Sequence, residues 1–544
     1  MTAKHPFAIT LDVGTSLANR TGSWRTVKPV YADHLPPCNA QCPAGENIQG
    51  WLFHAESGDY RAAWEVLVRD NPLPAVMGRA CYHTCETACN RGHLDEPVSI
   101  HAVERFLGDL AIREGWRVEP GPATGKRVLV IGAGPSGLSA AYHLARLGHA
   151  VTIAEAGPKP GGMMRFGIPK YRLPRDVLDA EVARILAMGV ELTLDTTIDD
   201  IPKAMKDGGF NACFAAIGAH LAKRVEIPAV AAGRILDAVS VLRGMETADE
   251  PPKLGRRVVV YGGGNTAIDV ARTAKRLGAE EAVIVYRRTR AMMPAHDFEV
   301  EEALEEGVMM RWLSTIKRVD EGALTVETMA LDEHGWPQPT GEFETIAGDT
   351  LILALGQDVD TSVIEAVPGV TVNKDRTIAV GPDLQTGHPG LFCGGDMVPA
   401  ERTVTVAVGH GKKAARHIDA YLRGQAHEPP PKHAVASAER LNSWYYTDAP
   451  QTVQPVLDAL RRRTTFDEVK GGLDEGTALF EARRCLSCGN CFECDNCFGV
   501  CPDNAVVKLG PGNRFRFNYD FCKGCGLCAA ECPCGAIDMV PEEI

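Results

Sequence analysis

The feature that most constrains this chain is a doubled run of cysteines in residues 485–544. Each run reads Cys-x2-Cys-x2-Cys-x3-Cys-Pro, a spacing in which three thiolates ligate one 4Fe–4S cube and the fourth ligates the other cube. We therefore assign one cluster to Cys491, Cys494, Cys497 and Cys532, and a second to Cys522, Cys525, Cys528 and Cys501. The alternatives are a zinc ribbon or a disulfide knot, but zinc needs only four ligands. A module of this kind handles single electrons.

Length and charge narrow the class of protein. A chain of 544 residues has room for roughly three or four domains. The net charge of −13 argues against a nucleic-acid partner, because phosphate contacts need a basic face. The first residues lack a signal peptide and no later stretch is apolar enough to span a membrane, so we expect a cytoplasmic protein. In that compartment the 18 cysteines should be metal ligands and not disulfides.

Residues 1–125 carry a second cysteine-rich region. It begins with residues 1–35, which have little periodicity and are expected to form an extended arm, and a helical stretch covers residues 48–68. Its cysteines are Cys38, Cys42, Cys81, Cys85 and Cys89. Five thiolates cannot complete two clusters, and one is left over from a single cluster. Buried structural cysteines are the alternative.

The segment KRVLVIGAGPSGLSAAYHLARLGHAVTIAEA predicts a strand, a glycine turn, a helix and a second strand that ends in an acid. Gly132 would make the tight turn, Gly134 would let a pyrophosphate approach, and Gly137 would let helix and strand pack closely. The phosphates would lie at the helix N-terminus, with Glu155 on the ribose. The candidate residues are Gly132, Ala133, Gly134, Pro135, Ser136, Gly137 and Glu155. The alternative is a glycine turn without a ligand.

Residues 256–354 repeat this plan in GRRVVVYGGGNTAIDVARTAKRLGAEEAVIVYRRTR. The candidate nucleotide-binding residues are Gly262, Gly264, Asn265, Thr266, Ala267, Arg287 and Arg288. Two arginines stand where the first unit has Glu155. A carboxylate there would repel a 2′-phosphate, whereas Arg287 and Arg288 would bind one bidentately, which favours NADP(H) over NAD(H). Two arginines on a solvated strand end are the alternative.

Several stretches resemble the small subunit of bacterial glutamate synthase. CPAGENIQGWL, GRACYHTCETAC and VSIHAVERF match its N-terminal iron–sulfur domain, which also occurs in dihydropyrimidine dehydrogenase and in transhydrogenases that reduce ferredoxin. RTRAMMPA, LILALGQDVD and AIGAH match its two-nucleotide core. The resemblance implies FAD in the first unit, with Gly162 in the loop GPKPGGMMRFGIPKYRLP contacting the flavin. It also implies that Asp396 holds the ribityl chain and that Thr403 and Val404 face the flavin ring.

The resemblance further implies two clusters in the N-terminal domain. One would be held by Cys42, Cys81, Cys85 and Glu104. The other would take Cys38, Cys89 and two cysteines that the family carries upstream and this chain lacks. We predict that Cys485 and Cys488 supply the missing pair, so that four cubes find all their ligands. In the alternative, Cys485 and Cys488 bind nothing and Glu104 is a solvated helix residue.

The fold class predicted from these units is multidomain α/β, with two interleaved Rossmann-like domains between a helical iron–sulfur domain and a bacterial-type ferredoxin domain. The expected domains are 1–125 (helical iron–sulfur), 126–255 with 355–425 (FAD-binding), 256–354 (NAD(P)H-binding), 426–484 (connector) and 485–544 (ferredoxin-like, with two 4Fe–4S clusters).

The stretch CKGCGLCAAECPCGAI is similar to the delta subunit of 2-oxoacid:ferredoxin oxidoreductases. We therefore expect an FAD- and iron–sulfur-dependent oxidoreductase subunit of a hetero-oligomer, exchanging electrons between NAD(P)(H) and its clusters. The expected partner is a thiamine-diphosphate 2-oxoacid oxidoreductase of the 2-oxoglutarate, pyruvate or phenylglyoxylate type. No catalytic side chain is expected, because hydride and electron transfer are cofactor chemistry. The alternatives are a glutamate-synthase-type NADPH-oxidising subunit and a non-catalytic electron-wiring scaffold.

Overall fold

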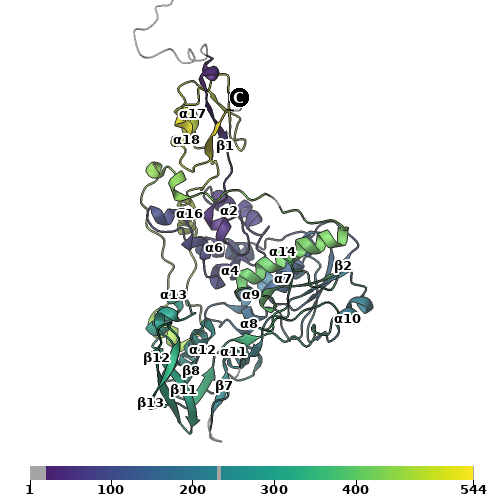
Figure 1. Ribbon diagram of the computed structural model, residues 1–544, viewed down its shortest axis with the longest axis vertical. Coiled ribbons are helices and arrows are strands. Elements are labelled where there is room, and N and C mark those ends of the chain that lie inside the picture. The colour runs from purple at the N-terminus through teal and green to yellow at the C-terminus, as the bar shows by residue number, and fades with distance from the viewer. Residues whose placement is uncertain (1–19, 224, 230–233, 430, 543–544) are drawn as a thin grey trace, which may run out of the picture.

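The computed structural model describes residues 20–223, 225–229, 234–429 and 431–542. Figure 1 shows an elongated molecule in which a small cysteine-rich module stands at one end, helices lie beneath it, and two sheet-containing units lie beyond the helices. Among the described residues, no helix is both long and apolar enough to cross a membrane.

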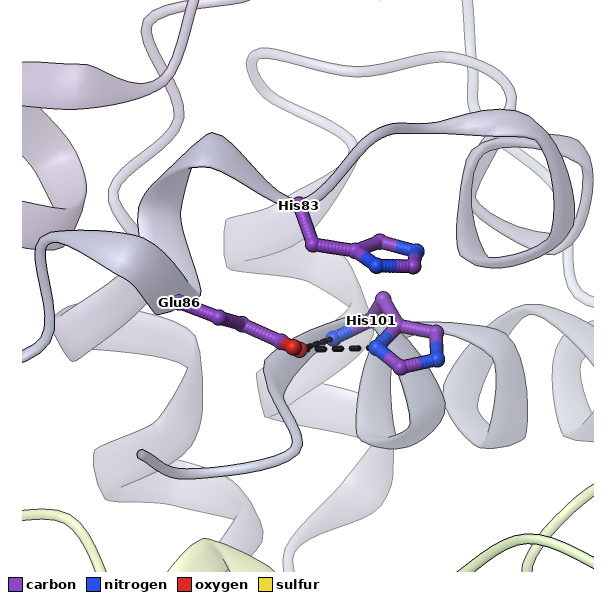
Figure 2. A group of neighbouring side chains, drawn as sticks. All are labelled: His83, Glu86 and His101. Atoms are coloured by element: carbon purple, nitrogen blue, oxygen red, sulfur yellow. Dashed lines mark hydrogen bonds and ion pairs between the residues drawn. The ribbon is translucent and has the colours of Figure 1, made fainter. Parts of the chain in front are cut away.

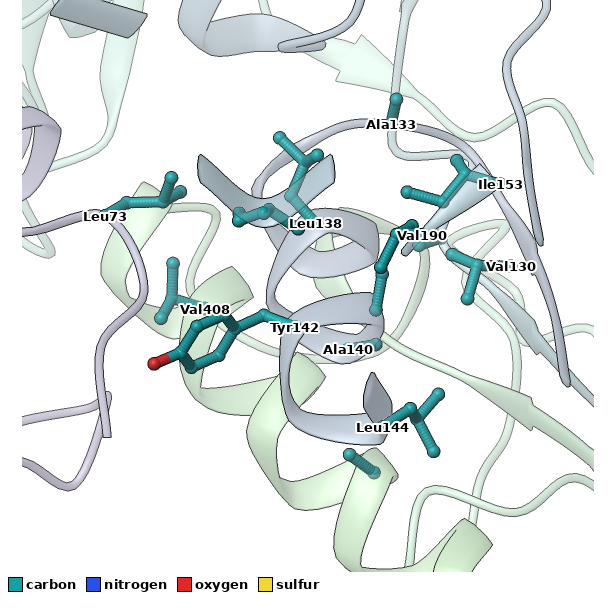
Figure 3. Close-up of a cluster of buried hydrophobic side chains, with 14 of the residues drawn as sticks. Leu73, Val130, Ala133, Leu138, Ala140, Tyr142, Leu144, Ile153, Val190 and Val408 are labelled. Atoms are coloured by element: carbon teal, nitrogen blue, oxygen red, sulfur yellow. The ribbon is translucent and has the colours of Figure 1, made fainter. Parts of the chain in front are cut away.

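The first parallel sheet has the strand order β16-β5-β2-β3-β4. Its strands are β2 (Arg127–Ile131), β3 (Ala150–Ala154), β4 (Glu191–Thr193), β5 (Ala212–Ala215) and β16 (Leu391–Cys393). β2 and β5 are almost wholly buried, as expected of central strands with both faces covered. The helices of this unit are α7 (Pro135–Arg146), α8 (Met163–Phe166), α9 (Arg175–Leu186), α10 (Ile201–Gly208) and α14 (Val404–Arg423). Figure 3 shows Leu138 and Tyr142 of α7 meeting Val408 of α14 in a buried cluster.

The second parallel sheet has the order β10-β9-β8-β14-β7. Its strands are β7 (Ile235–Asp237), β8 (Arg257–Tyr261), β9 (Glu281–Val285), β10 (Met309–Arg311) and β14 (Thr350–Leu353). Its helices are α11 (Ala238–Thr247), α12 (Asn265–Arg276) and α13 (Asp297–Glu305). β7 lies within residues 126–255, which we predicted to belong to the first unit, yet it pairs with β14. The second unit therefore begins before the predicted boundary, because strand pairing and not the glycine motif sets where a sheet ends.

Two small antiparallel sheets accompany the second parallel sheet. A three-stranded sheet is formed by β11 (Ser314–Asp320), β12 (Ala323–Leu331) and β13 (Pro337–Ala347). Where the chain crosses between the units, β6 (Leu221–Ala222) pairs with β15 (Gln357–Asp358). The two units are also joined by Arg172, whose guanidinium bridges the buried carboxylates of Asp269 (2.8 Å) and Glu299 (2.5 Å) on the second unit.

The helical N-terminal domain consists of short helices packed around one core. They are α1 (Pro37–Gln41), α2 (Ile48–Ala55), α3 (Tyr60–Leu67), α4 (Pro74–Ala80), α5 (Thr84–Thr87) and α6 (Ile100–Arg113). The core also takes in Ala478 and Ala482 of α16 (Glu475–Arg483), which follows α15 (Ala459–Thr464) in the connector. The connector thus returns the chain to its N-terminal domain, immediately before Cys485.

The N-terminal arm is part of the C-terminal module. β1 (Val27–Tyr31) pairs antiparallel with β19 (Ile537–Pro541), and Figure 1 shows the start of the described chain beside the module. Arg25 extends this contact with an ion pair to Glu542 at 2.7 Å. The remaining elements of the module are α17 (Asn496–Gly499), β17 (Val506–Lys508), β18 (Phe515–Phe517) and α18 (Leu527–Ala530). The described part of the expected arm, residues 20–35, therefore contains a strand that completes the ferredoxin-like module, and residues 1–19 of that arm lie outside the described residues.

Candidate functional site

A cavity of about 440 Å³ lies where the first sheet meets α7 and α14. The predicted FAD residues that line it are Gly132, Gly134, Pro135, Ser136, Glu155, Gly162, Asp396, Thr403 and Val404. The other two predicted residues lie behind the loop: Ala133 is buried in the core, and a Cβ on Gly137 would stand 1.9 Å from the Gly132 carbonyl oxygen. The volume is within the usual range for cofactor pockets.

The glycine loop faces the cavity with backbone groups, because its glycines carry no Cβ. Gly132 has φ +100°, and a Cβ there would stand 2.5 Å from the carbonyl oxygen of Ala216. The carboxylate of Glu155 is anchored on both oxygens, which accept from Ala133 N and from Gly157 N at 2.7 Å each. Because each carboxylate oxygen has a further lone pair, Glu155 can also accept from a ribose hydroxyl.

The opposite side of the cavity is built by Asp396 and the start of α14. Burial raises the pKa of Asp396 to about 6, and Arg402 opposes that shift. Thr403 caps α14, its hydroxyl accepting from Val406 N at 3.2 Å. The positive end of this helix therefore faces the cavity, where it favours an anionic group.

The second glycine loop has the same shape. Gly262 has φ +148°, and a Cβ there would stand 2.2 Å from the Ala354 carbonyl oxygen. Gly264 begins α12, and Ala267, in the first turn, is fully buried. Thr266 between them is half-buried. The loop can hold a pyrophosphate as the first one can.

The two arginines of the second unit lie at the end of β9. Arg287 is exposed, and the half-buried Arg288 stacks its guanidinium on the ring of Trp336 at 4.9 Å. A pyrophosphate bound over α12 would place a 2′-phosphate near this strand end. Both guanidinium groups could bind it there.

Asn265 is held from outside its own unit. Its Nδ2 donates to Tyr82 Oη at 2.6 Å, and its Oδ1 accepts from His296 N at 3.1 Å. The ring of Tyr82 stacks on that of His296, with 3.8 Å between centroids. Because Tyr82 follows Cys81, the iron–sulfur domain contacts the second nucleotide loop directly, a contact that no local sequence pattern indicated.

The first predicted N-terminal ligand group comes together in the structure. Burial raises the pKa of Cys42 and of Cys85, and Cys81 lies close enough to both thiols to add to each shift. Burial, followed by the Glu104 carboxylate, raises the pKa of Cys81 to about 12. Glu104 is only 6% exposed, so the alternative of a solvated residue is excluded.

A further carboxylate, Glu46, lies at the same place and was missed by the sequence. Asn71 Nδ2 donates to Glu104 Oε1 at 2.7 Å and to Glu46 Oε1 at 3.1 Å. Burial raises the pKa of Glu46 to about 7. Buried thiolates and carboxylates carry negative charge that must be balanced. A cationic iron cluster would balance it, so this group fits such a cluster.

The second N-terminal group joins the two ends of the chain. A small cavity of about 20 Å³ is lined by Cys38, Cys89, Cys485 and Cys488 together with apolar side chains. Arg91 fixes the segment just before Cys485, because its guanidinium donates to the Arg484 carbonyl oxygen at 2.8 Å. The structure thus brings Cys485 and Cys488 next to Cys38 and Cys89, and a cluster held by these four cysteines stays a prediction.

The structure separates the C-terminal octet into two groups of four cysteines. Burial raises the pKa of Cys491, Cys494 and Cys497, and Cys532 lies close enough to add to each shift. The other cavity of the module is lined by Cys501, Cys522, Cys525 and Cys528. Cys494 and Cys525 are exposed. Outside the predicted sets, Cys534 lies 3.7 Å from Cys532, whereas Cys213 and Cys393 are buried in the first sheet.

His83, Glu86 and His101 form another group of potential metal ligands in the described chain (Figure 2). His101 Nδ1 is 2.7 Å from Glu86 Oε1, and its Nε2 is 2.9 Å from Gln454 Oε1. The two imidazoles stack face to face at 3.6 Å. Since both nitrogens of His101 are engaged and stacked rings do not point at one centre, we interpret this group as a brace for the cysteine loop 81–89.

Comparison with known families matches three parts of the chain. A model of pyridine nucleotide-disulphide oxidoreductases matches residues 126–411. A model of dihydropyrimidine dehydrogenase domain II, with a 4Fe–4S cluster, matches residues 31–116. A 4Fe–4S binding domain matches residues 515–538. These matches confirm the predicted fold class and the predicted cofactor types.

Three similar proteins cover most of the chain. The NADP(+)-dependent formate dehydrogenase subunit beta of Moorella thermoacetica is 35% identical over 504 residues, covering 83% of this chain and 70% of its own. The NADPH-Fe(3+) oxidoreductase subunit beta of Geobacter sulfurreducens is 35% identical over 516 residues, covering 84% and 75%. The NAD-dependent dihydropyrimidine dehydrogenase subunit PreT of Salmonella typhimurium is 31% identical over 393 residues, covering 72% and 92%. All three are named as subunits.

Proposed function

The chain belongs to the pyridine nucleotide-disulphide oxidoreductase family, and on that premise we propose that it is the electron-transfer subunit of a complex linking NADP(H) to a partner enzyme. FAD, when bound, exchanges a hydride with the nicotinamide and single electrons with iron–sulfur clusters. The observation that carries the proposal is the arrangement of the cysteines: the predicted ligands fall into four groups that lead from the flavin cavity to the outer module.

The cavity residues would position the flavin. The first glycine loop would hold the pyrophosphate at the N-terminus of α7, and Glu155 would accept from the ribose. Asp396 would accept from the ribityl chain. Thr403 and Val404 would place the positive end of α14 against the flavin ring, where it stabilises added negative charge.

The first cysteine group adjoins this cavity through α14. Thr403 and Val404 line the cavity, and the next residue, Thr405, donates its hydroxyl to Cys81 Sγ at 3.2 Å. Neighbouring residues of one helix turn therefore contact both the flavin cavity and a predicted cluster ligand. This contact makes the group Cys42, Cys81, Cys85 and Glu104 the first one beyond the flavin.

The second group shares its surroundings with the first. Cys38, Cys42, Cys85 and Cys89 all pack in the core of the helical domain. On the far side, Tyr446 lies between this group and the outer module. Burial raises the pKa of its phenol most, and nearby thiols from both places, including Cys485 and Cys494, raise it further. The group of Cys38, Cys89, Cys485 and Cys488 therefore lies between the first group and the octet.

The octet would be the outlet. Cys494 and Cys525 are exposed, whereas the cysteines of the two inner groups are buried or half-buried. Electrons would therefore leave or enter at the outer module, at the end of the molecule furthest from the second nucleotide unit in Figure 1.

For the partner, we propose a thiamine-diphosphate 2-oxoacid oxidoreductase, because the tail is similar to the ferredoxin-type subunit of those enzymes. Electrons would then flow from the oxoacid through the clusters to NADP+. A second candidate, a formate-oxidising partner, is favoured by the similarity to a subunit named for NADP(+)-dependent formate dehydrogenase.

The function is tested on purified protein and then with partners. Anaerobic addition of NADPH should bleach the flavin absorbance, and iron analysis should give about sixteen irons per chain for four cubes. Failure of both NADPH and NADH to bleach the flavin would favour an electron-wiring scaffold. Mixing the chain with 2-oxoacid oxidoreductases or with formate dehydrogenase catalytic subunits should give substrate-dependent NADPH formation with one class; no reduction with 2-oxoacids would remove the first candidate.

A further inference from the structure

Tyr31 brings a hydroxyl from the N-terminal arm to a cysteine of the C-terminal octet. Its Oη lies 3.3 Å from Cys497 Sγ, although the two residues are 466 positions apart in the chain. Its ring stacks on Phe517 with 4.9 Å between centroids and an interplanar angle of 19°. The contact is therefore made by a packed and half-buried side chain.

The backbone fixes this position. Tyr31 is the last residue of β1 and stands opposite Ile537 in the pairing with β19. The next residue continues the attachment, with Ala32 N donating to the Ala536 carbonyl oxygen at 3.1 Å. At the other end of the strand, Arg25 donates to the carbonyl oxygens of Tyr519 and Cys522 and pairs with Glu542. Contacts of Arg25 before the strand and of Ala32 after it thus fix the arm at both ends of β1.

The direction of the hydrogen bond follows from the ligand chemistry. A cysteine that binds iron does so as the thiolate, which has no proton to give. A phenol keeps its proton near neutral pH. In a loaded module, Tyr31 must therefore be the donor and Cys497 the acceptor.

We propose that Tyr31 tunes the iron–sulfur cluster of Cys491, Cys494, Cys497 and Cys532, raising its reduction potential through the hydrogen bond to Cys497. This inference rests on the proposed function, because it needs the octet to hold clusters. Hydrogen bonds to ligand sulfur are among the factors that set cluster potentials. A donor stabilises negative charge on sulfur, and the reduced cluster carries one more negative charge, so the donor favours reduction.

Within the described residues, no tyrosine hydroxyl bonds to the cysteines predicted for the other cube, Cys501, Cys522, Cys525 and Cys528. The nearby phenol of Tyr519 donates to the Pro29 carbonyl oxygen at 2.8 Å and not to a cysteine. Tyr31 would therefore give the two cubes different reduction potentials. The cube of Cys491, Cys494, Cys497 and Cys532, which is nearer the inner cysteine groups, would have the higher one. That inequality would favour electron transfer from the outer cube inward, which suits a chain that passes a partner's electrons to NADP+.

The test is a redox titration of the holoenzyme followed by electron paramagnetic resonance. Tyr31→Phe removes the hydroxyl and keeps the stacked ring. It should shift one cluster to a more negative midpoint potential and leave the other clusters and the iron content unchanged. The shifted signal should be the one that Cys494→Ser perturbs. Tyr519→Phe is the matched control, because it removes a hydroxyl bonded to the same strand and should shift no cluster.

Electron–nuclear double resonance in deuterated buffer gives a second readout. After brief exchange, which labels hydroxyls before hydrogen-bonded backbone amides such as that of Ala536 on Cys532, wild-type protein should show an exchangeable deuteron coupled to that cluster, and Tyr31→Phe should lose it. If Tyr31→Phe loses iron, the wild-type deuteron decides, and its absence overturns the proposal. Equal potentials in wild type and Tyr31→Phe with full iron overturn the tuning role and leave the proposed function intact. A wild-type protein without octet clusters overturns both, and its iron content reveals that case.

Discussion

The two nucleotide-binding units share one plan and differ at one position. In both, a glycine with positive φ turns the chain into a helix, and a neighbouring carbonyl leaves no room for a Cβ. At the end of the second strand, the first unit has Glu155, anchored by two backbone N–H groups, and the second has Arg287 and Arg288. We propose that the shared loop sets where the phosphates lie and that the differing side chains set which nucleotide each unit accepts.

Reversing the charge at Glu155 should have the largest effect. Glu155→Arg removes the acceptor for both backbone N–H groups and for the ribose, so we expect purified protein with almost no flavin. Glu155→Gln, which keeps one acceptor oxygen, should retain part of it. Flavin released by denaturation and measured per chain is the readout; full flavin occupancy in Glu155→Arg would show that this strand end does not select the nucleotide.

The cavity of the first unit is buried, whereas the strand end that carries Arg287 is exposed. The raised pKa of Asp396 reports this burial. Its pKa is raised to about 6 from an ordinary 3.8, so its protonated form is favoured in the folded state. Stability from this group is complete below about pH 4 and is lost as pH rises through about 6, a change of about 3 kcal/mol. Melting temperatures of flavin-free protein should fall across that window relative to Asp396→Asn. Parallel curves for the two proteins would argue for a solvated Asp396.

The arginine pair should decide the cofactor of the second unit. Replacing Arg287 and Arg288 by alanine removes charge-assisted hydrogen bonds to a 2′-phosphate, which should raise the Kd for NADPH about 10- to 100-fold. The Kd for NADH should not change. Arg290→Ala, which removes an exposed arginine paired with Glu301, is the control. Nucleotide titration followed by fluorescence gives these constants, and equal losses for NADPH and NADH would contradict the assignment.

The smallest expected effect concerns the contact between Tyr82 and Asn265. The cavity of the first unit is lined by that unit and by Val239 and Arg243 of α11, whereas the glycine loop of the second unit is steadied by the iron–sulfur domain. Tyr82→Phe removes one hydrogen bond worth about 1 kcal/mol, so NADPH and NADH should both bind about fivefold more weakly. Flavin content should be unchanged. A change confined to NADPH would mean that Tyr82 acts through the 2′-phosphate site.

Local patterns were predictable from the sequence, and distant pairings were not. The glycine turns and the octet are encoded within a few residues, so their spacing alone indicated strand–turn–helix units and a cluster module. The strand β1 pairs with residues some 500 positions away, and its sequence VKPVY carries no sign of that partner. Tyr31, Glu46 and Tyr82 acquire their contacts only through tertiary packing, which overrides local propensity.

The proposed cluster of Cys38, Cys89, Cys485 and Cys488 is the central claim, because it would connect the flavin domain to the outer module. The direct test is Cys485→Ser with Cys488→Ser, reduced by dithionite, freed of the reductant and mixed with NADP+. We predict about four fewer irons than wild type, flavin that NADPH still bleaches, and octet clusters reoxidised at least about 100-fold more slowly. Full iron content with octet reoxidation at the wild-type rate would contradict the claim.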